Sequence, residues 1–243
     1  MPSQPLHLRL VDADGAISNS VVAMDPMSAF EVDHVLKLGL CDILESIADA
    51  LPHTADASLA TVAVRCLRNG LPEHVALEEN HLFPLLRSRN ARDQSCKKVL
   101  LQLEHEHSSD ESFAYEIADE LELIAEAKAP KNAEMLGYML RGFFISQRRH
   151  IRWENATVLP LARRTLTEAD LAELSEAITA RNCNDEGLRI LETVSDVITN
   201  SYWGLTSSQT PPDDNRTVFV NACTQNSALA DVIKRRLRHR LRL

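Results

Sequence analysis

Four long stretches of this chain place apolar residues at steps of three, four or seven, which is the repeat of an amphipathic helix. Similar stripes occur over residues 25–50, from about residue 57 to residue 85, and over residues 132–164. The clearest stripe, within roughly residues 92–128, consists of Leu100, Leu103, His107, Glu111, Ala114, Ala118 and Leu121. Four long helices with short connections predict an all-α protein whose architecture is an antiparallel, up-down-up-down four-helix bundle.

The sequence also indicates where these helices begin and where they are interrupted. Asp25 can cap the first helix, and Pro26 suits its first helical position. Pro72 interrupts the second stretch, and a proline inside a helix removes a hydrogen bond and clashes with the preceding turn. We therefore expect a kink or a short break near residues 70–72, and Pro84 predicts another local distortion near the end of that helix.

A chain of 243 residues can bury one sizeable core and still carry an appendage. We expect an N-terminal arm over residues 1–24, a helical domain over residues 25–182 and a C-terminal extension over residues 183–243. The domain should end with a short extra helix over about residues 167–181, capped by a threonine. In the extension, residues 183–203 could form another amphipathic helix, and residues 207–215 have the prolines and small polar residues of a linker.

The net charge of −9 conceals an uneven distribution of charge. Residues 234–243 contain six lysines and arginines and no acid, so the rest of the chain is more acidic than the total suggests. An acidic body is poorly suited to bind the phosphate backbone, and we expect no specific nucleic-acid partner. The basic tail could touch an acidic partner, a membrane surface or nucleic acid, although a solvated, partly disordered tail is the simpler interpretation.

Neither a leader peptide nor a membrane span is evident in the sequence. The N-terminus lacks a basic region followed by an apolar run, and no stretch approaches 18 uninterrupted apolar residues. The five cysteines are scattered without CxxC pairing, which indicates reduced thiols that serve mostly in packing. We therefore expect a cytoplasmic protein.

Three of the predicted stripes contain a histidine followed four residues later by a glutamate: His74 and Glu78, His107 and Glu111, and His150 and Glu154. Residues four apart share a helix face, so each pair replaces two core hydrophobes by an imidazole and a carboxylate. The first helix adds His34, again on its inner face. Burying these groups without partners would cost several kcal/mol each, so something must compensate them.

The predicted ligand set is His34, His74, Glu78, His107, Glu111, His150 and Glu154. Seven ligands exceed what one tetrahedral zinc can use, but they fit two ions of five or six coordination bridged by carboxylates and a solvent-derived oxygen. Imidazole and carboxylate ligands without thiolate favour iron or manganese over copper or structural zinc. We expect two non-haem iron ions as the cofactor.

Four segments of the chain resemble the helices of the hemerythrin family, in the cation-binding group named for its His/His/Glu pattern: VDHVLKLGLCDILESIAD, EHVALEENHLFPLL, LEHEHSSDESFAYEIADEL and HIRWENATVLPLARR. The similarity covers about residues 25–182. It implies a non-haem di-iron site inside an up-down-up-down bundle, with Glu78 and Glu154 as bridging carboxylates. The chain departs in one way from the oxygen-carrying members that this resemblance brings in. Those members have the pattern HxxxH on the third helix, whereas this chain has His107 followed by Glu111.

Three functional hypotheses follow from this resemblance. In the first, the iron centre senses or handles oxygen, iron supply, or nitrosative or oxidative stress, with a small ligand such as O2, NO or H2O2. In the second, the protein is an enzyme that consumes peroxide or nitric oxide. In the third, it is a scaffold or regulatory bundle with a structural metal. The sequence decides neither enzymatic activity nor oligomeric state.

Several alternatives concern individual residues. Glu111 could support a ligand instead of binding metal, and His81 or His105 could replace a ligand. His105 lies about 200° around the helix from His107, which predicts that it faces solvent. A metal-free bundle is the simplest rival class. Ferritin-like bundles are another, but they pair Glu with His three residues apart, whereas these pairs are four apart.

Overall fold

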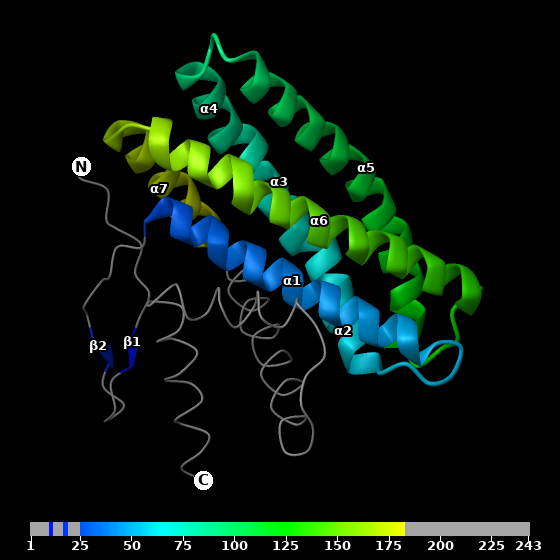
Figure 1. The fold of residues 1–243 in the computed structure, drawn as a ribbon. Coiled ribbons are helices and arrows are strands. Elements are labelled where there is room, and N and C mark those ends of the chain that lie inside the picture. Colours follow the sequence, from blue (N-terminus) through cyan, green and yellow to red (C-terminus); the bar gives the residue numbers. More distant parts are fainter. Residues whose placement is uncertain (1–9, 12–16, 19–24, 183–243) are drawn as a thin grey trace, which may run out of the picture.

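The computed structural model describes residues 10–11, 17–18 and 25–182 (Figure 1). From residue 25 onward the described chain consists of helices and their connections, which confirms the all-α prediction. The helices are α1 (Pro26–Ala50), α2 (Ala57–Arg65), α3 (Leu71–Leu77), α4 (Phe83–Arg89), α5 (Gln94–Ala125), α6 (Ala133–Thr165) and α7 (Glu168–Asn182), with π-helical segments η1 (Cys66–Gly70) and η2 (Glu78–Leu82). Before them, β1 (Leu10–Val11) and β2 (Ile17–Ser18) pair as two antiparallel strands.

Each long helix begins where a short polar side chain satisfies its first free N–H groups. The capping residues are Asp25 before α1, Asp56 before α2, Asp93 before α5 and Asn132 before α6. The predicted extra helix is α7, and Thr167 caps it reciprocally with Asp170: each side-chain oxygen accepts the other residue's backbone N–H.

The predicted break near residues 70–72 is a widened turn in a helix that continues from α2 to α4. Leu71 donates its N–H to the carbonyl of Cys66, five residues back, and Phe83 does the same to Glu78. A proline, which has no N–H, follows each widened turn: Pro72 after η1 and Pro84 after η2. The two π-helical turns therefore absorb the prolines without ending the helix, and the second contains Glu78.

Four helical segments lie side by side: α1, the continuous run from α2 to α4, α5 and α6 (Figure 1). The closest packing is between α1 and α6 and between α2 and α5. Two apolar clusters fill the interior, one around Leu44, Leu67 and Phe143 and the other around Phe30 and Phe83. Along each segment, the residues of one cluster precede those of the other. The predicted ligand positions fall between them, except that Glu78 directly follows Leu77 of the second cluster.

Helix α7 packs against α1 and α3 beside this core. Its buried residues Leu174 and Ile178 join the second apolar cluster. In the described residues, no helix combines the length and apolar character needed to cross a membrane. The predicted helix over residues 183–203, the linker over residues 207–215 and the basic tail lie outside the described residues.

Candidate metal centre

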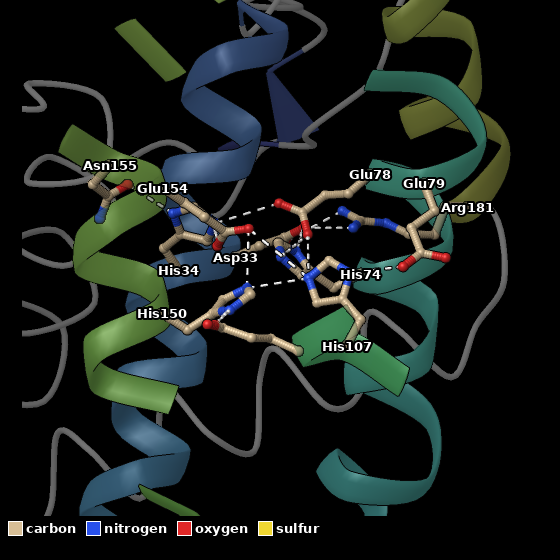
Figure 2. Close-up of polar contacts among 11 residues, drawn as sticks. Asp33, His34, His74, Glu78, Glu79, His107, His150, Glu154, Asn155 and Arg181 are labelled. Carbon is tan, nitrogen blue, oxygen red and sulfur yellow. Dashed lines mark hydrogen bonds and ion pairs between the residues drawn. The ribbon is translucent and has the colours of Figure 1, made fainter. Parts of the chain in front are cut away.

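A polar layer separates the two apolar clusters, and six of the seven predicted ligands form it (Figure 2). They come from all four helical segments: His34 from α1, His74 from α3, Glu78 from η2, His107 from α5, and His150 and Glu154 from α6. All six are buried, and Glu78 and Glu154 are 0% exposed. Two carboxylates at this depth require positively charged or N–H partners to remain ionised.

The six residues form two groups that share one carboxylate. In the first group, ligand atoms of His34, His74, Glu78 and Glu154 lie within 4.8 Å of one another. In the second, the same holds for His107, His150 and Glu154. Glu154 spans the two because its Oε2 lies 3.3 Å from His34 Nε2 and its Oε1 lies 3.1 Å from His150 Nε2.

Glu78 also faces imidazoles of both groups. Its Oε2 lies 3.3 Å from His74 Nε2 and 3.4 Å from His107 Nε2, while its Oε1 lies 3.9 Å from His34 Nε2. The two carboxylates thus stand between the imidazoles of α1 and α3 and those of α5 and α6.

The donor atoms in the middle of this layer fit a metal site. Among the described residues, six buried atoms have no hydrogen-bond partner: Nε2 of His34 and His74, and both carboxylate oxygens of Glu78 and Glu154. The same atoms lie 3.1 to 3.9 Å from imidazole or carboxylate partners as ion pairs, and buried polar atoms that lack a hydrogen bond are costly in an ordinary core. Metal–ligand bonds of about 2.1 Å place neighbouring ligand atoms about 3.0 to 3.4 Å apart, close to the shorter separations seen here.

The outer nitrogen of every imidazole is held by an oxygen acceptor. Each Nδ1–H donates to one side chain: His34 to Asn155 at 2.7 Å, His74 to Asp33 at 3.3 Å, His107 to Glu79 at 2.9 Å and His150 to Glu106 at 3.0 Å. These bonds fix the ring orientation and aim Nε2 inward, as partners of metal-bound histidines do. Figure 2 shows the four rings converging with their Nε2 atoms toward the carboxylates.

Sequence reasoning missed three of these four acceptors: Asp33, Glu106 and Asn155. The fourth, Glu79, lies about 100° off the apolar stripe, where the sequence predicts a side chain that is solvated or hydrogen-bonded near the rim, and it is half-buried and bonded to His107. Each of the four is adjacent in sequence to a predicted ligand, which was the available signal. A neighbour of an inward-facing residue lies about 100° around the helix, where it can reach the ring of a histidine on another helix.

The charges of the cluster stabilise one another. Burial lowers the pKa of His34, but the adjacent carboxylates of Glu154 and Glu78 outweigh it and raise the pKa to about 10. Burial and repulsion from Glu154 raise the pKa of Glu78, but His74 and His34 overcome them and lower it to about 2. The pKa of Glu154 is also held well below its usual value against burial, by His150 and His34. The protein thus presents ionised carboxylates to a cation at neutral pH.

The remaining predicted ligand, Glu111, is exposed and belongs to neither group. A position four residues after His107 predicts the inner face, but α5 turns Glu111 toward solvent at the edge of a cavity. The alternatives also fall outside the two groups: His105 is exposed, as predicted from its angle, and His81 is half-buried. Cys41 is buried, and burial raises the pKa of its thiol to about 12, as expected for a packing residue.

Comparison with protein families matches residues 25–162 to the family described as the hemerythrin HHE cation-binding domain. The matched residues begin at the cap of α1 and end near the end of α6, so they contain all six grouped side chains and exclude α7. Comparisons with curated proteins and with solved structures gave no match.

Proposed function

Because the chain belongs to the hemerythrin HHE cation-binding family, we propose that it binds two iron ions between its helices and uses them to sense or handle a small oxidant. The four helical segments would form the up-down-up-down bundle, with residues 25–182 as the metal-binding domain. The proposal goes beyond what family membership and the buried His/Glu cluster establish, which is a protein suited to bind metal.

Six side chains would hold the two ions. His34 and His74 would bind one ion, and His107 and His150 the other, with Glu154 and Glu78 facing both. The observation that carries this proposal is the set of six buried ligand atoms without a hydrogen bond, which lie where four imidazoles converge whose Nδ1 atoms are already engaged. Glu111 is left out because it is exposed.

The donor set narrows the choice of metal, and the proposed redox role selects iron. Four imidazoles and two carboxylates without a thiolate suit iron or manganese. When bound, two iron ions would supply a redox couple able to react with O2, NO or H2O2. The free thiols of Cys41, Cys66 and Cys96 are compatible with a reducing compartment, and we propose the cytoplasm.

The test is metal analysis of the full chain after anaerobic loading with Fe²⁺. We expect about two irons per chain, as the two ligand groups imply. Glu154→Ala should lose iron, whereas Glu111→Ala, the matched i,i+4 glutamate outside the groups, should keep it. Fewer than about one iron per chain in the wild-type protein, with circular dichroism showing intact helices, would refute the proposal.

A second measurement separates the functional hypotheses. Di-ferrous protein mixed with oxygen should oxidise rapidly and irreversibly if it is a sensor or an oxidase. A stable absorption that disappears when oxygen is removed would identify a carrier instead. Steady-state consumption of peroxide, abolished in Glu154→Ala, would favour the enzyme.

A further inference from the structure

Helix α7 lies outside the residues that match the family, but it packs against the elements that carry most of the first ligand group. These elements are α1, α3 and η2, which contribute His34, His74 and Glu78. The inward side of α7 is a stripe with steps of four, four and three residues: Asp170, Leu174, Ile178 and Arg181. The helix is therefore docked beside one half of the candidate metal centre.

Both ends of this stripe are fixed by an arginine paired with an aspartate. At the start of α7, Asp170 accepts hydrogen bonds from Nε and Nη2 of Arg89 at 2.7 and 2.9 Å. At its end, Arg181 donates from Nη1 and Nη2 to the two carboxylate oxygens of Asp33. The side chains of Arg181 and Asp33 are only 16% and 12% exposed. A two-bond pair at this depth holds the carboxylate in one orientation.

Asp33 is the residue through which α7 reaches the metal centre. Its Oδ2 accepts from Arg181 and also from Nδ1 of His74, at 3.3 Å (Figure 2). The carboxylate acceptors of the other rings, Glu106 and Glu79, are more exposed, at 18% and 34%. Asp33 thus joins a candidate ligand to a helix that the family match does not include.

Docking of α7 and metal binding at His74 depend on the same carboxylate. With α7 docked, Asp33 is held where it directs Nε2 of His74 toward the candidate site. With α7 released, Asp33 would gain rotational freedom, and metal binding would have to order it again at a cost in conformational entropy. Linkage is reciprocal, so the factor by which docking raises metal affinity is also the factor by which metal favours docking.

We propose that Arg181 is a positioning residue that couples the docking of α7 to metal binding at His74. The inference rests on the proposed function because it requires that His74 binds an ion. It adds a regulation of that site: metal occupancy stabilises docked α7, and a partner that pulls α7 away lowers the affinity for metal. Because α7 directly precedes residues 183–243, a partner bound to that segment would act on the metal centre through Arg181.

The experiment measures the affinity of the metal-free full chain for Mn²⁺, a redox-stable probe, by competition with a chelator. In Arg181→Met the affinity should fall at least about fivefold, the lower end of typical coupling between two sites. Arg181→Lys, which keeps the charge, should recover at least half of this loss on a logarithmic scale. If Arg181→Met does not fold, Arg181→Gln takes its place.

The matched control is Arg163→Met. It breaks another arginine pair with α1, at Asp25 and Glu31, neither of which accepts a hydrogen bond from a ligand ring in the described structure. Its affinity for Mn²⁺ should stay within about twofold of the wild type, because an exposed ion pair contributes little and does not orient a ligand.

A double-mutant cycle separates this role from a general effect on stability. In the Asp33→Ala background, Arg181→Met should lower the affinity by less than about a further twofold, because the carboxylate through which Arg181 acts is gone. Hydrogen exchange measures the reverse direction of the coupling. Saturating Mn²⁺ should slow exchange of the α7 amides at least about fivefold in the wild type and less than about twofold in Arg181→Met.

The outcomes distinguish this inference from the proposed function. Affinity of Arg181→Met within twofold of the wild type, additive losses in the double variant, or α7 exchange that does not respond to Mn²⁺ would overturn the inference and leave the proposed function standing. A wild-type chain that binds neither Mn²⁺ nor Fe²⁺ would refute both.

Discussion

Arg181, near the end of α7, donates hydrogen bonds from both terminal guanidinium nitrogens to the carboxylate of Asp33. Asp33 also accepts the Nδ1–H of His74 at 3.3 Å, so α7 is connected to the candidate metal centre through a single carboxylate (Figure 2). Burial raises the pKa of Asp33, but the hydrogen bond to His74 and the charge of Arg181 together lower it to about 2. Asp33 therefore remains ionised and orients His74.

Replacement of this carboxylate should weaken metal binding without removing a ligand. Asp33→Asn keeps the shape of the side chain but loses the charge, and outer partners of metal-bound histidines typically contribute about 10- to 100-fold in affinity. We expect a loss of that size in a competition titration with a chelator. Asp49→Asn, an exposed aspartate of α1 paired with Arg141, is the matched control and should bind metal like the wild type.

Metal should stabilise the fold because the ligands come from all four helical segments. At a free concentration about 1,000 times the dissociation constant, one bound ion adds about 4 kcal/mol to the free energy of unfolding. For a domain of this size that corresponds to a rise of about 8 to 16 °C in melting temperature. Thermal scans with and without metal measure the rise. Glu154→Ala should abolish it, and an equal rise in that variant would contradict the shared role of Glu154.

The attachment of α7 should depend on its buried leucine. Leu174 is 0% exposed in the second apolar cluster, and truncating such a side chain costs about 2 to 5 kcal/mol. Urea unfolding of Leu174→Ala should show a loss within that range. Leu101→Ala removes a leucine that is 61% exposed and should change the unfolding free energy by less than about 0.5 kcal/mol. Equal effects of the two substitutions would show that α7 does not pack as described.

The sequence predicted the features that depend on periodicity and capping. The stripe positions of His34, His74 and His150 predict burial, and these residues are 1%, 2% and 1% exposed. Helix starts at Asp25 and Asn132 are confirmed by their capping hydrogen bonds. Such features are local, because a helix face and its first turn are determined by residues a few positions apart.

Features that depend on contacts between helices were not predictable from spacing. Glu111 satisfies the same i,i+4 rule as Glu154, yet one is exposed and the other fully buried, because the rotation of each helix depends on its neighbours. The hydrogen bond between His107 and Glu79 joins residues 28 positions apart, and Arg181 reaches Asp33 across 148 positions. Each π-helical turn lies just before a proline. The prolines in the sequence indicate that the helix is distorted there, but not that the distortion is a π-helical turn.

Metal affinity should increase with pH, because protons occupy the same donor atoms. The pKa of His34 is raised from its ordinary value of 6.5 to about 10 by the adjacent carboxylates, so its ring is protonated at pH 7 in the metal-free protein. Coordination requires a neutral Nε2, and binding must release this proton. We expect the affinity for Mn²⁺, a redox-stable probe, to rise by about tenfold per pH unit between pH 7 and 9.

The raised pKa of His34 also makes the stability of the metal-free protein depend on pH. Protonated His34 contributes stability that is fully present below about pH 6.5 and is lost as the pH rises through about 10. The melting temperature of the metal-free chain should therefore fall between pH 7 and 10. His34→Gln, which cannot be protonated, should flatten this decline. A wild-type melting temperature that is constant over this range, with Mn²⁺ affinity equally constant, would show that His34 holds no proton in the folded state.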